Sequence, residues 1–200
     1  MTLLYIIIRQ NGIKNNSYEI IVMKTFKQHI YEKLKVSSKR TTHTLFPETL
    51  EELFGMITDE IYKHGYECSL NHIDVSKITN MSQLFLDSKF NGDISEWDVS
   101  NVENMGFMFY NSKFNGDISD WNVSNVEHMM GMFGSSKFTG ENGDISNWDV
   151  SKVENMGGMF QNSIFNGDIS DWDVSKVTNM RNMFFNSPLE NNPPKWYEAV

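Results

Sequence analysis

Acidic side chains recur at a fixed step through residues 70–187, and they are the residues of this chain best suited to chemistry. Two sets take matching positions around the tryptophans. The first set is His72, Glu96, Asp120, Asn147 and Asp171, and the second is Asp74, Asp98, Asn122, Asp149 and Asp173. Rows of carboxylates attract basic protein segments or cations, whereas rows that only face water keep a protein soluble. Both interpretations stay open here.

A third set of aspartates follows glycine, and its members are Asp93, Asp117, Asp144 and Asp168. Calcium-binding β-roll repeats also place aspartate in glycine-rich turns. Here each turn offers only one aspartate, and hydrogen bonds from turn amides to its carboxylate account for it without a metal. We therefore expect no calcium, no other metal and no cofactor.

No catalytic constellation can be assembled from the unrepeated residues. The histidines are His29, His43, His64, His72 and His128, and their spacing is not that of metal ligands. The single cysteine, Cys68, has no acid–base partner in the sequence and excludes an intrachain disulfide. The sequence therefore predicts a protein that is not an enzyme.

The elements that position the acidic residues come from an internal repeat. Copies of F-N-G-D-I-S-x-W begin at Phe90, Phe114 and Phe165, and degenerate copies extend back to Tyr66 and forward to Trp196. Tryptophans of successive copies, starting from Trp97, lie 24, 27 and 24 residues apart. A unit of this length cannot bury its own apolar face, so neighbouring units have to stack.

Within one unit, Ile94, Trp97 and Val99 match the L-x-x-L-x-L spacing of leucine-rich repeats. This spacing predicts a strand over residues 96–100, with Trp97 and Val99 inside and the acidic residues outside. Ser100 and Glu103 form an S-x-x-E capping box, which predicts a helical turn or two that buries Met105, Met108 and Phe109. The predicted fold class is a leucine-rich-repeat-like repeat solenoid of about five coils, each with one short parallel strand and one short helical segment, and with an N-terminal helical cap.

The chain divides into four parts. Residues 1–22 are a leader or a hairpin, or an over-extended start, because Met23 can open a polypeptide of its own. Residues 23–65 are a helical cap, with one helix around Phe26, Ile30 and Leu34 and a second that starts near Pro47 and carries an apolar stripe. Residues 66–187 are the repeat array, and residues 188–200 are a degenerate last coil that ends the stack at Pro193 and Pro194. The stripe consists of Leu50, Leu53, Phe54, Ile57 and Ile61.

The charge distribution narrows the classes of partner. The net charge is −9, and residues 70–187 carry 7 Lys and Arg against 16 Asp and Glu. An acidic array repels nucleic acid and anionic lipid, so a protein with a basic surface is the expected partner. No stretch reaches the roughly 18 apolar residues of a membrane span, and residues 3–8 are too short for a secretory signal.

The repeat motif F-N-G-D-I-S-x-W-D-V-S-x-V-x-N-M-x-x-M-F resembles the BspA-like leucine-rich-repeat surface proteins from about Tyr66 to Trp196. The resemblance implies a secreted or surface-anchored protein that acts in adhesion or host interaction, and similar arrays occur in phage and large-virus proteins. Because no export signal, lipid-attachment cysteine or wall anchor is evident, the cell surface, the cytoplasm and a virion all remain open as locations.

These observations predict a non-enzymatic protein-interaction module of the adhesion or host-interaction type, with an acidic sheet face as its contact surface. The alternative is a structural spacer or virion-associated scaffold that has no dedicated binding site. The residues expected on the acidic face are Asp74, Glu96, Asp98, Asp120, Asn122, Asp149, Asp171 and Asp173.

Overall fold

The computed structural model describes residues 42–197. The described residues belong to one compact unit, Thr42–Val200. The predicted leader or hairpin in residues 1–22 and the predicted helix around Phe26, Ile30 and Leu34 lie outside the described residues.

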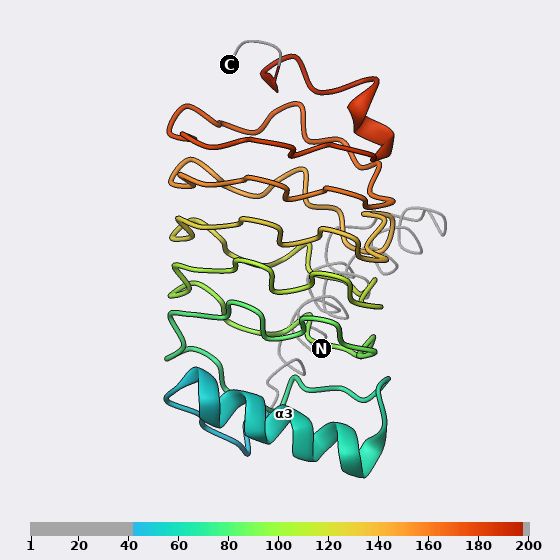
Figure 1. The fold of residues 1–200 in the computed structure, drawn as a ribbon. Helices are drawn as coiled ribbons and strands as arrows, with labels where there is room; N and C mark the ends of the chain where they lie inside the picture. The colour runs from blue at the N-terminus through green and yellow to red at the C-terminus, as the bar shows by residue number, and fades with distance from the viewer. Residues whose placement is uncertain (1–41, 198–200) are drawn as a thin grey trace, which may run out of the picture. The chain divides into compact units, whose positions relative to one another are not determined.

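The predicted second helix is confirmed as α3, Leu50–His64, which lies across one end of the array (Figure 1). Its first turn is capped by Thr49, whose hydroxyl accepts a hydrogen bond from the Glu52 amide, and Gly65 ends it with a positive φ of 87°. Leu53 and Ile57 are buried in the core. Phe54 was expected in the same stripe but is 55% exposed, because the buried face of α3 is narrower than the sequence indicates.

From Tyr66 onward the chain forms stacked layers, and each repeat step returns it beside the preceding layer (Figure 1). Isolated parallel bridges join equivalent residues of successive layers: Asn80, Asn104, His128, Asn155 and Asn179. The amides of alternate residues then donate to carbonyls of the next layer at 2.8–2.9 Å, and the donors are Met105, Phe107, Phe109 and Asn111. These hydrogen bonds set the register between layers.

The predicted fold class, a leucine-rich-repeat-like solenoid, is wrong, because its secondary-structure elements do not form. Among the described residues the layers contain no strand, and the only helix besides α3 is the short 3-10 helix η1, Pro188–Glu190. A coil made of one strand and one helical segment is therefore absent from this part of the chain. Each layer consists of turns and isolated bridges instead.

The helical segment fails because its backbone amides have other acceptors. The Ser100 hydroxyl donates to Asp98 at 2.6 Å, and the Glu103 amide donates to the Thr79 carbonyl of the preceding layer at 2.8 Å. Phe107 and Asn111 have φ values of +57° and +53°, which no right-handed helix allows. The predicted capping box of Ser100 and Glu103 is therefore wrong.

The strand over residues 96–100 fails because turns bend both of its ends. The Trp97 amide closes a turn onto the Ile94 carbonyl at 3.2 Å, and the Ser100 amide folds back onto the Asp98 carboxylate at 3.1 Å. The predicted alternation of burial is nevertheless confirmed, since Trp97 and Val99 are buried and Asp98 is exposed.

Aromatic rings fill the core in columns that run along the array. Phe109 stacks on Phe133 at 5.6 Å between ring centroids, and Phe133 on Phe160 at 5.8 Å. Met105 and Met108 are fully buried as predicted. Each tryptophan also bonds to the preceding layer, as the Trp121 indole N–H does to the Ile94 carbonyl at 3.1 Å. Tryptophan thus fills the core and satisfies a buried carbonyl at once.

The last partial layer repeats that contact. The Trp196 indole donates to the Ile169 carbonyl at 2.9 Å, and Leu189 is 8% exposed. The extension of the repeat to Trp196 is thereby confirmed. At the other end Tyr66, the counterpart of buried Phe90, is 48% exposed, so the first copy is structurally degenerate.

Two glycines at equivalent positions provide a test of the packing between layers. Gly131 and Gly158 have φ values of +63° and +62°. A Cβ on Gly131 would lie 2.5 Å from the Phe107 ring, whereas one on Gly158 would meet only the flexible Gln161 side chain, with Oε1 at 3.1 Å. We expect Gly158→Ala to cost about 1 kcal/mol through its left-handed backbone. Gly131→Ala adds overpacking and should cost about 2–4 kcal/mol. Denaturant unfolding of both variants measures the two free energies of unfolding. Equal losses of that free energy would contradict the clash between an alanine side chain at position 131 and the Phe107 ring.

Candidate functional site: acidic rows and an adjacent groove

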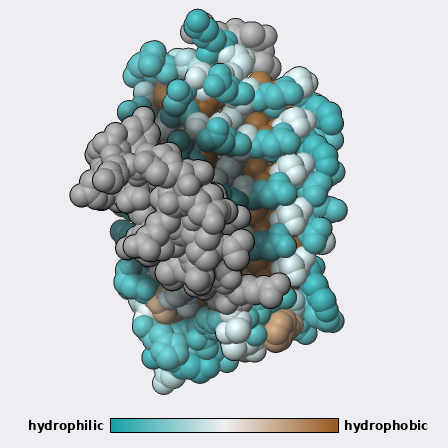
Figure 2. Space-filling model, turned by 180° about the vertical axis from the view of Figure 1, so that it is seen from behind, coloured by the Kyte–Doolittle hydropathy of each residue, from teal (hydrophilic) through white to brown (hydrophobic). Residues whose placement is uncertain are grey.

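The predicted acidic residues form rows because the layers stack in register. The Glu96 row consists of Glu96 and its equivalents His72, Asp120, Asn147 and Asp171. The Asp98 row consists of Asp98 and its equivalents Asp74, Asn122, Asp149 and Asp173. Figure 2, a view from behind, shows hydrophilic residues in columns along the array with a hydrophobic stripe visible between them. The charge of Asp173 acts on Asp149 in the adjacent layer, so neighbouring members of the row interact.

Members of the Asp98 row shape the backbone that carries them. Each accepts the amide hydrogen of the serine two residues later, as Asp98 Oδ1 does from Ser100 at 3.1 Å and Asp173 Oδ1 from Ser175 at 3.0 Å. Asn122 makes the same Asx turn with Ser124 at 3.2 Å, although it carries no charge. The turn therefore explains why Asp or Asn occupies this position. In each aspartate Oδ1 accepts the turn hydrogen bond, and Oδ2 takes no part in it.

The third predicted set, Asp93, Asp117, Asp144 and Asp168, makes the same kind of turn. The Asp117 carboxylate accepts both the amide and the hydroxyl of Ser119, at 3.0 and 2.7 Å. In the longest repeat step, from Trp121 to Trp148, the residues after Phe138 place Glu141 and Asp144 around one open hollow of about 460 Å³, which Asp168 and Asp171 also line. Among the described residues, no group of three or more His, Cys, Asp or Glu is arranged to hold a metal ion.

Serine hydrogen bonds perturb these carboxylates. The Ser170 hydroxyl, followed by its backbone amide, lowers the pKa of Asp168 below its usual range. The same two groups of Ser175 lower the pKa of Asp173, and those of Ser151 lower the pKa of Asp149. The ionised form is thus the form that the folded chain favours.

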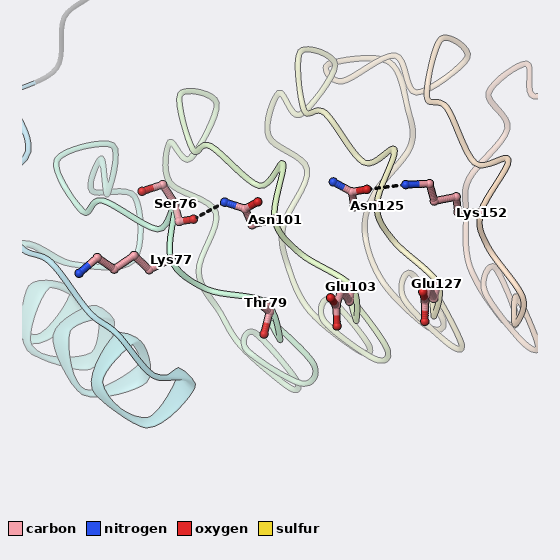
Figure 3. A pocket seen from close by; sticks show the side chains of 8 residues that line it. All are labelled: Ser76, Lys77, Thr79, Asn101, Glu103, Asn125, Glu127 and Lys152. Atoms are coloured by element: carbon pink, nitrogen blue, oxygen red, sulfur yellow. Dashed lines mark hydrogen bonds between the residues drawn. The ribbon is translucent and has the colours of Figure 1, made fainter.

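A groove of about 360 Å³ runs across several layers between two rows of polar side chains (Figure 3). The side chains of the first row, here called the first bank, are Ser76, Lys77, Asn101, Asn125 and Lys152, and those of the second bank are Thr79, Glu103 and Glu127. Hydrogen bonds fix side chains of the first bank: the Asn101 amide group donates to the Ser76 carbonyl at 2.8 Å, and Lys152 Nζ donates to Asn125 Oδ1 at 2.6 Å.

The glutamates of the second bank are the residues that the sequence interpretation missed. Glu103, Glu127 and Glu154, here called the Glu103 row, are exposed, and their side chains form no hydrogen bond or ion pair with another described residue. Their backbones are held in register, since the Glu127 amide donates to the Glu103 carbonyl at 2.8 Å. Each glutamate lies three residues after a serine, as Glu103 does after Ser100, and this spacing suggests a helix capping box. The Asp-x-Ser pattern at Asp98 and Ser100 indicates an Asx turn instead, and that signal could have revealed the row.

The most enzyme-like cluster lies at the end of α3. Glu60 Oε2 is 3.3 Å from His72 Nε2 and 3.7 Å from His64 Nε2. Burial raises the pKa of the nearby Cys68 thiol, which lowers its thiolate fraction and hence its nucleophilicity.

No described helix is long and apolar enough to cross a membrane.

The lowered aspartate pKa values generate a prediction about acid. A carboxylate with a depressed folded-state pKa contributes stability above its unfolded pKa of about 3.9 and loses it as the pH falls through the folded value. We expect the melting temperature to fall between about pH 5 and pH 3, and to fall less in the Asp149→Asn, Asp168→Asn, Asp173→Asn variant. Asparagine preserves the turn, as Asn122 shows. An identical acid dependence in both proteins would contradict the role of these carboxylates.

Comparison with known proteins places the chain in a family. Residues 48–162 and 134–198 both match the family DUF285, described as a Mycoplasma protein of unknown function. No curated protein matches the chain. No solved structure matches it either. The two family matches together cover most of the chain and all of the stacked layers from Tyr66 to Trp196, so the chain belongs to the DUF285 family.

Proposed function

We propose that this protein is a non-enzymatic interaction module of the adhesion or host-interaction type, which binds a basic segment of a partner protein along its acidic rows. The observation that carries the proposal is the Glu103 row, because its carboxylates are exposed and have no structural task among the described residues. Three like charges at adjacent layers, about 4.8 Å apart, repel one another unless a cation or a basic side chain lies against them.

The geometry of the row favours an extended partner. Glu103 and Glu154 are two layers apart, which corresponds to about 9.6 Å. A polyproline II segment advances about 3.1 Å per residue, so residues three apart in it are separated by about 9.3 Å. A partner segment with Lys or Arg at every third position therefore matches Glu103 and Glu154, which are two layers apart, and the groove between Asn101 and Glu103 offers space for its backbone.

The Asp98 and Glu96 rows extend the acidic surface of the proposal. Asp74, Asp98, Asp149 and Asp173 use one oxygen for the Asx turn and keep a negative charge, while Asp120 and Asp171 are exposed. The resemblance of the repeat to BspA-like surface proteins supports an adhesive role, at the level of the repeat motif only.

The alternative is a structural spacer or virion-associated scaffold. The observation that favours it is the Asx turn, because the Asp98 row is explained by folding alone. The two functions differ in what they require of Glu103, Glu127 and Glu154, since a scaffold needs no charge at these positions.

We expect the chain to capture a labelled peptide of repeated Lys-Pro-Pro, measured by fluorescence anisotropy at low ionic strength. Glu103→Gln, Glu127→Gln, Glu154→Gln should weaken capture roughly tenfold, since exposed ion pairs contribute about 0.2–1 kcal/mol each. A Glu-Pro-Pro peptide should not bind.

The matched control is Asp98→Asn, Asp149→Asn, Asp173→Asn, which removes the same charge and preserves the turns. A smaller loss in this variant assigns the main contact to the Glu103 row, and a larger loss assigns it to the Asp98 row. Undiminished capture in both variants would contradict the interaction module and favour the scaffold.

A further inference from the structure

We propose that a partner of the Glu103 row is a second copy of this chain, paired about a two-fold axis parallel to the stacking direction. The inference rests on the proposed function, because it identifies the basic surface that the row binds. That surface has to carry positive charges at the spacing of the layers, and this chain carries such a set itself.

The basic set is the Lys113 row, consisting of Lys89, Lys113 and Lys137. All three lysines are exposed, and none forms an ion pair with another described residue. The amides of Lys113 and Lys137 donate to the Ser88 and Ser112 carbonyls of the preceding layers at 2.9 and 3.1 Å, so the lysines repeat once per layer. An uncompensated positive row on a chain of net charge −9 indicates a contact with an acidic surface.

The two rows border the same segment of each layer. Glu103 begins the segment that Lys113 ends, and Glu127 and Lys137 do the same in the next layer. Phe107 and Tyr110 lie between them, half-buried, with ring centroids 5.7 Å apart. Met130 is 37% exposed in the same region. In the proposed pairing these segments form one face, with glutamates at one edge, lysines at the other, and Phe107, Tyr110 and Met130 between them.

Exposed apolar residues continue the middle of this face into the first and last layers. Leu86 and Phe185 take the position of Tyr110 there and are 37% and 52% exposed. An apolar centre with a charged rim is the usual composition of a protein interface. Exposed ion pairs between the two rows contribute little binding free energy each, so a stable contact also needs the apolar centre.

Only one orientation of a second copy satisfies both edges. A two-fold axis parallel to the stacking direction keeps each layer at its level and exchanges the edges, so Glu103 meets Lys113 of the second copy and Glu127 meets its Lys137. The symmetry generates the reciprocal pairs, which gives four in all. A two-fold axis across the layers would oppose like rows, which repel. Phe107 and Tyr110, near the middle of the segment, then meet their own copies.

Sedimentation of the full chain tests the pairing. We expect a dimer at about 50 mM salt that weakens at about 500 mM, because the exposed pairs are screened. Lys113→Glu, Lys137→Glu and, separately, Glu103→Lys, Glu127→Lys should each weaken association roughly 30-fold or more. An equimolar mixture of these two variants should dimerise again, because every opposed pair is then attractive. This rescue also shows that both variants are folded.

The matched control reverses two exposed lysines outside the face, Lys176→Glu and Lys195→Glu, and should leave the dimer unchanged. A mixture that stays monomeric, or reversal variants that associate like the unmodified chain, would overturn the pairing. A monomeric chain that still captures the Lys-Pro-Pro peptide overturns the second copy as partner and leaves the proposed function standing. If the chain dimerises and the mixed variants dimerise again, but the chain captures no basic peptide, the pairing is supported and the Glu103 row serves self-association alone.

Discussion

Hydrogen bonds between layers are the constraint on which the rest of the structure depends. The amides of Met105, Phe107 and Phe109 donate forward to His128, Met130 and Met132, while Glu103 donates backward to Thr79. Between them, Met108 and Tyr110 close turns within the layer. The amides that donate forward cannot form the i to i−4 bonds of a helix, and these turns, with positive φ values at Phe107 and Asn111, interrupt a strand. The bonds between layers also place equivalent residues directly above one another. The aromatic columns and the charged rows both follow from this register.

The Asx turns are what allow such a backbone to fold. Asp98, Asn104 and their equivalents bend the chain at fixed places, because each side chain accepts the backbone amide two residues later. Positive φ values at Phe107 and Asn111 complete the turns, and at Gly131, which takes the position of Phe107 in the next layer, the Phe107 ring leaves no space for a side chain. The Asp98 row thus has a task in folding, whereas the side chains of the Glu103 row form no such turn among the described residues.

The repeat step, the buried tryptophans and methionines and the helix α3 could be predicted from the sequence, because burial periodicity and capping residues are local signals. The elements inside a layer could not. Ser100 is compatible with a helix cap and with an Asx turn, and the choice between them depends on whether the Glu103 amide finds a carbonyl in the preceding layer. That contact is non-local, so no window of sequence contains it. The Glu103 row was hidden by the same ambiguity, and the opposition of Glu103 and Lys113 across a face appears only once the layers are stacked.

Scalar couplings across hydrogen bonds in solution test this account most directly. A long-range HNCO experiment on the labelled chain reports which carbonyl accepts each amide. The account predicts correlations from Met105 to the carbonyl of His128, from Phe107 to that of Met130 and from Phe109 to that of Met132. Correlations from Met105 to the carbonyl of Asn101, four residues earlier, would show a helical segment and contradict the stacked layers and both charged rows.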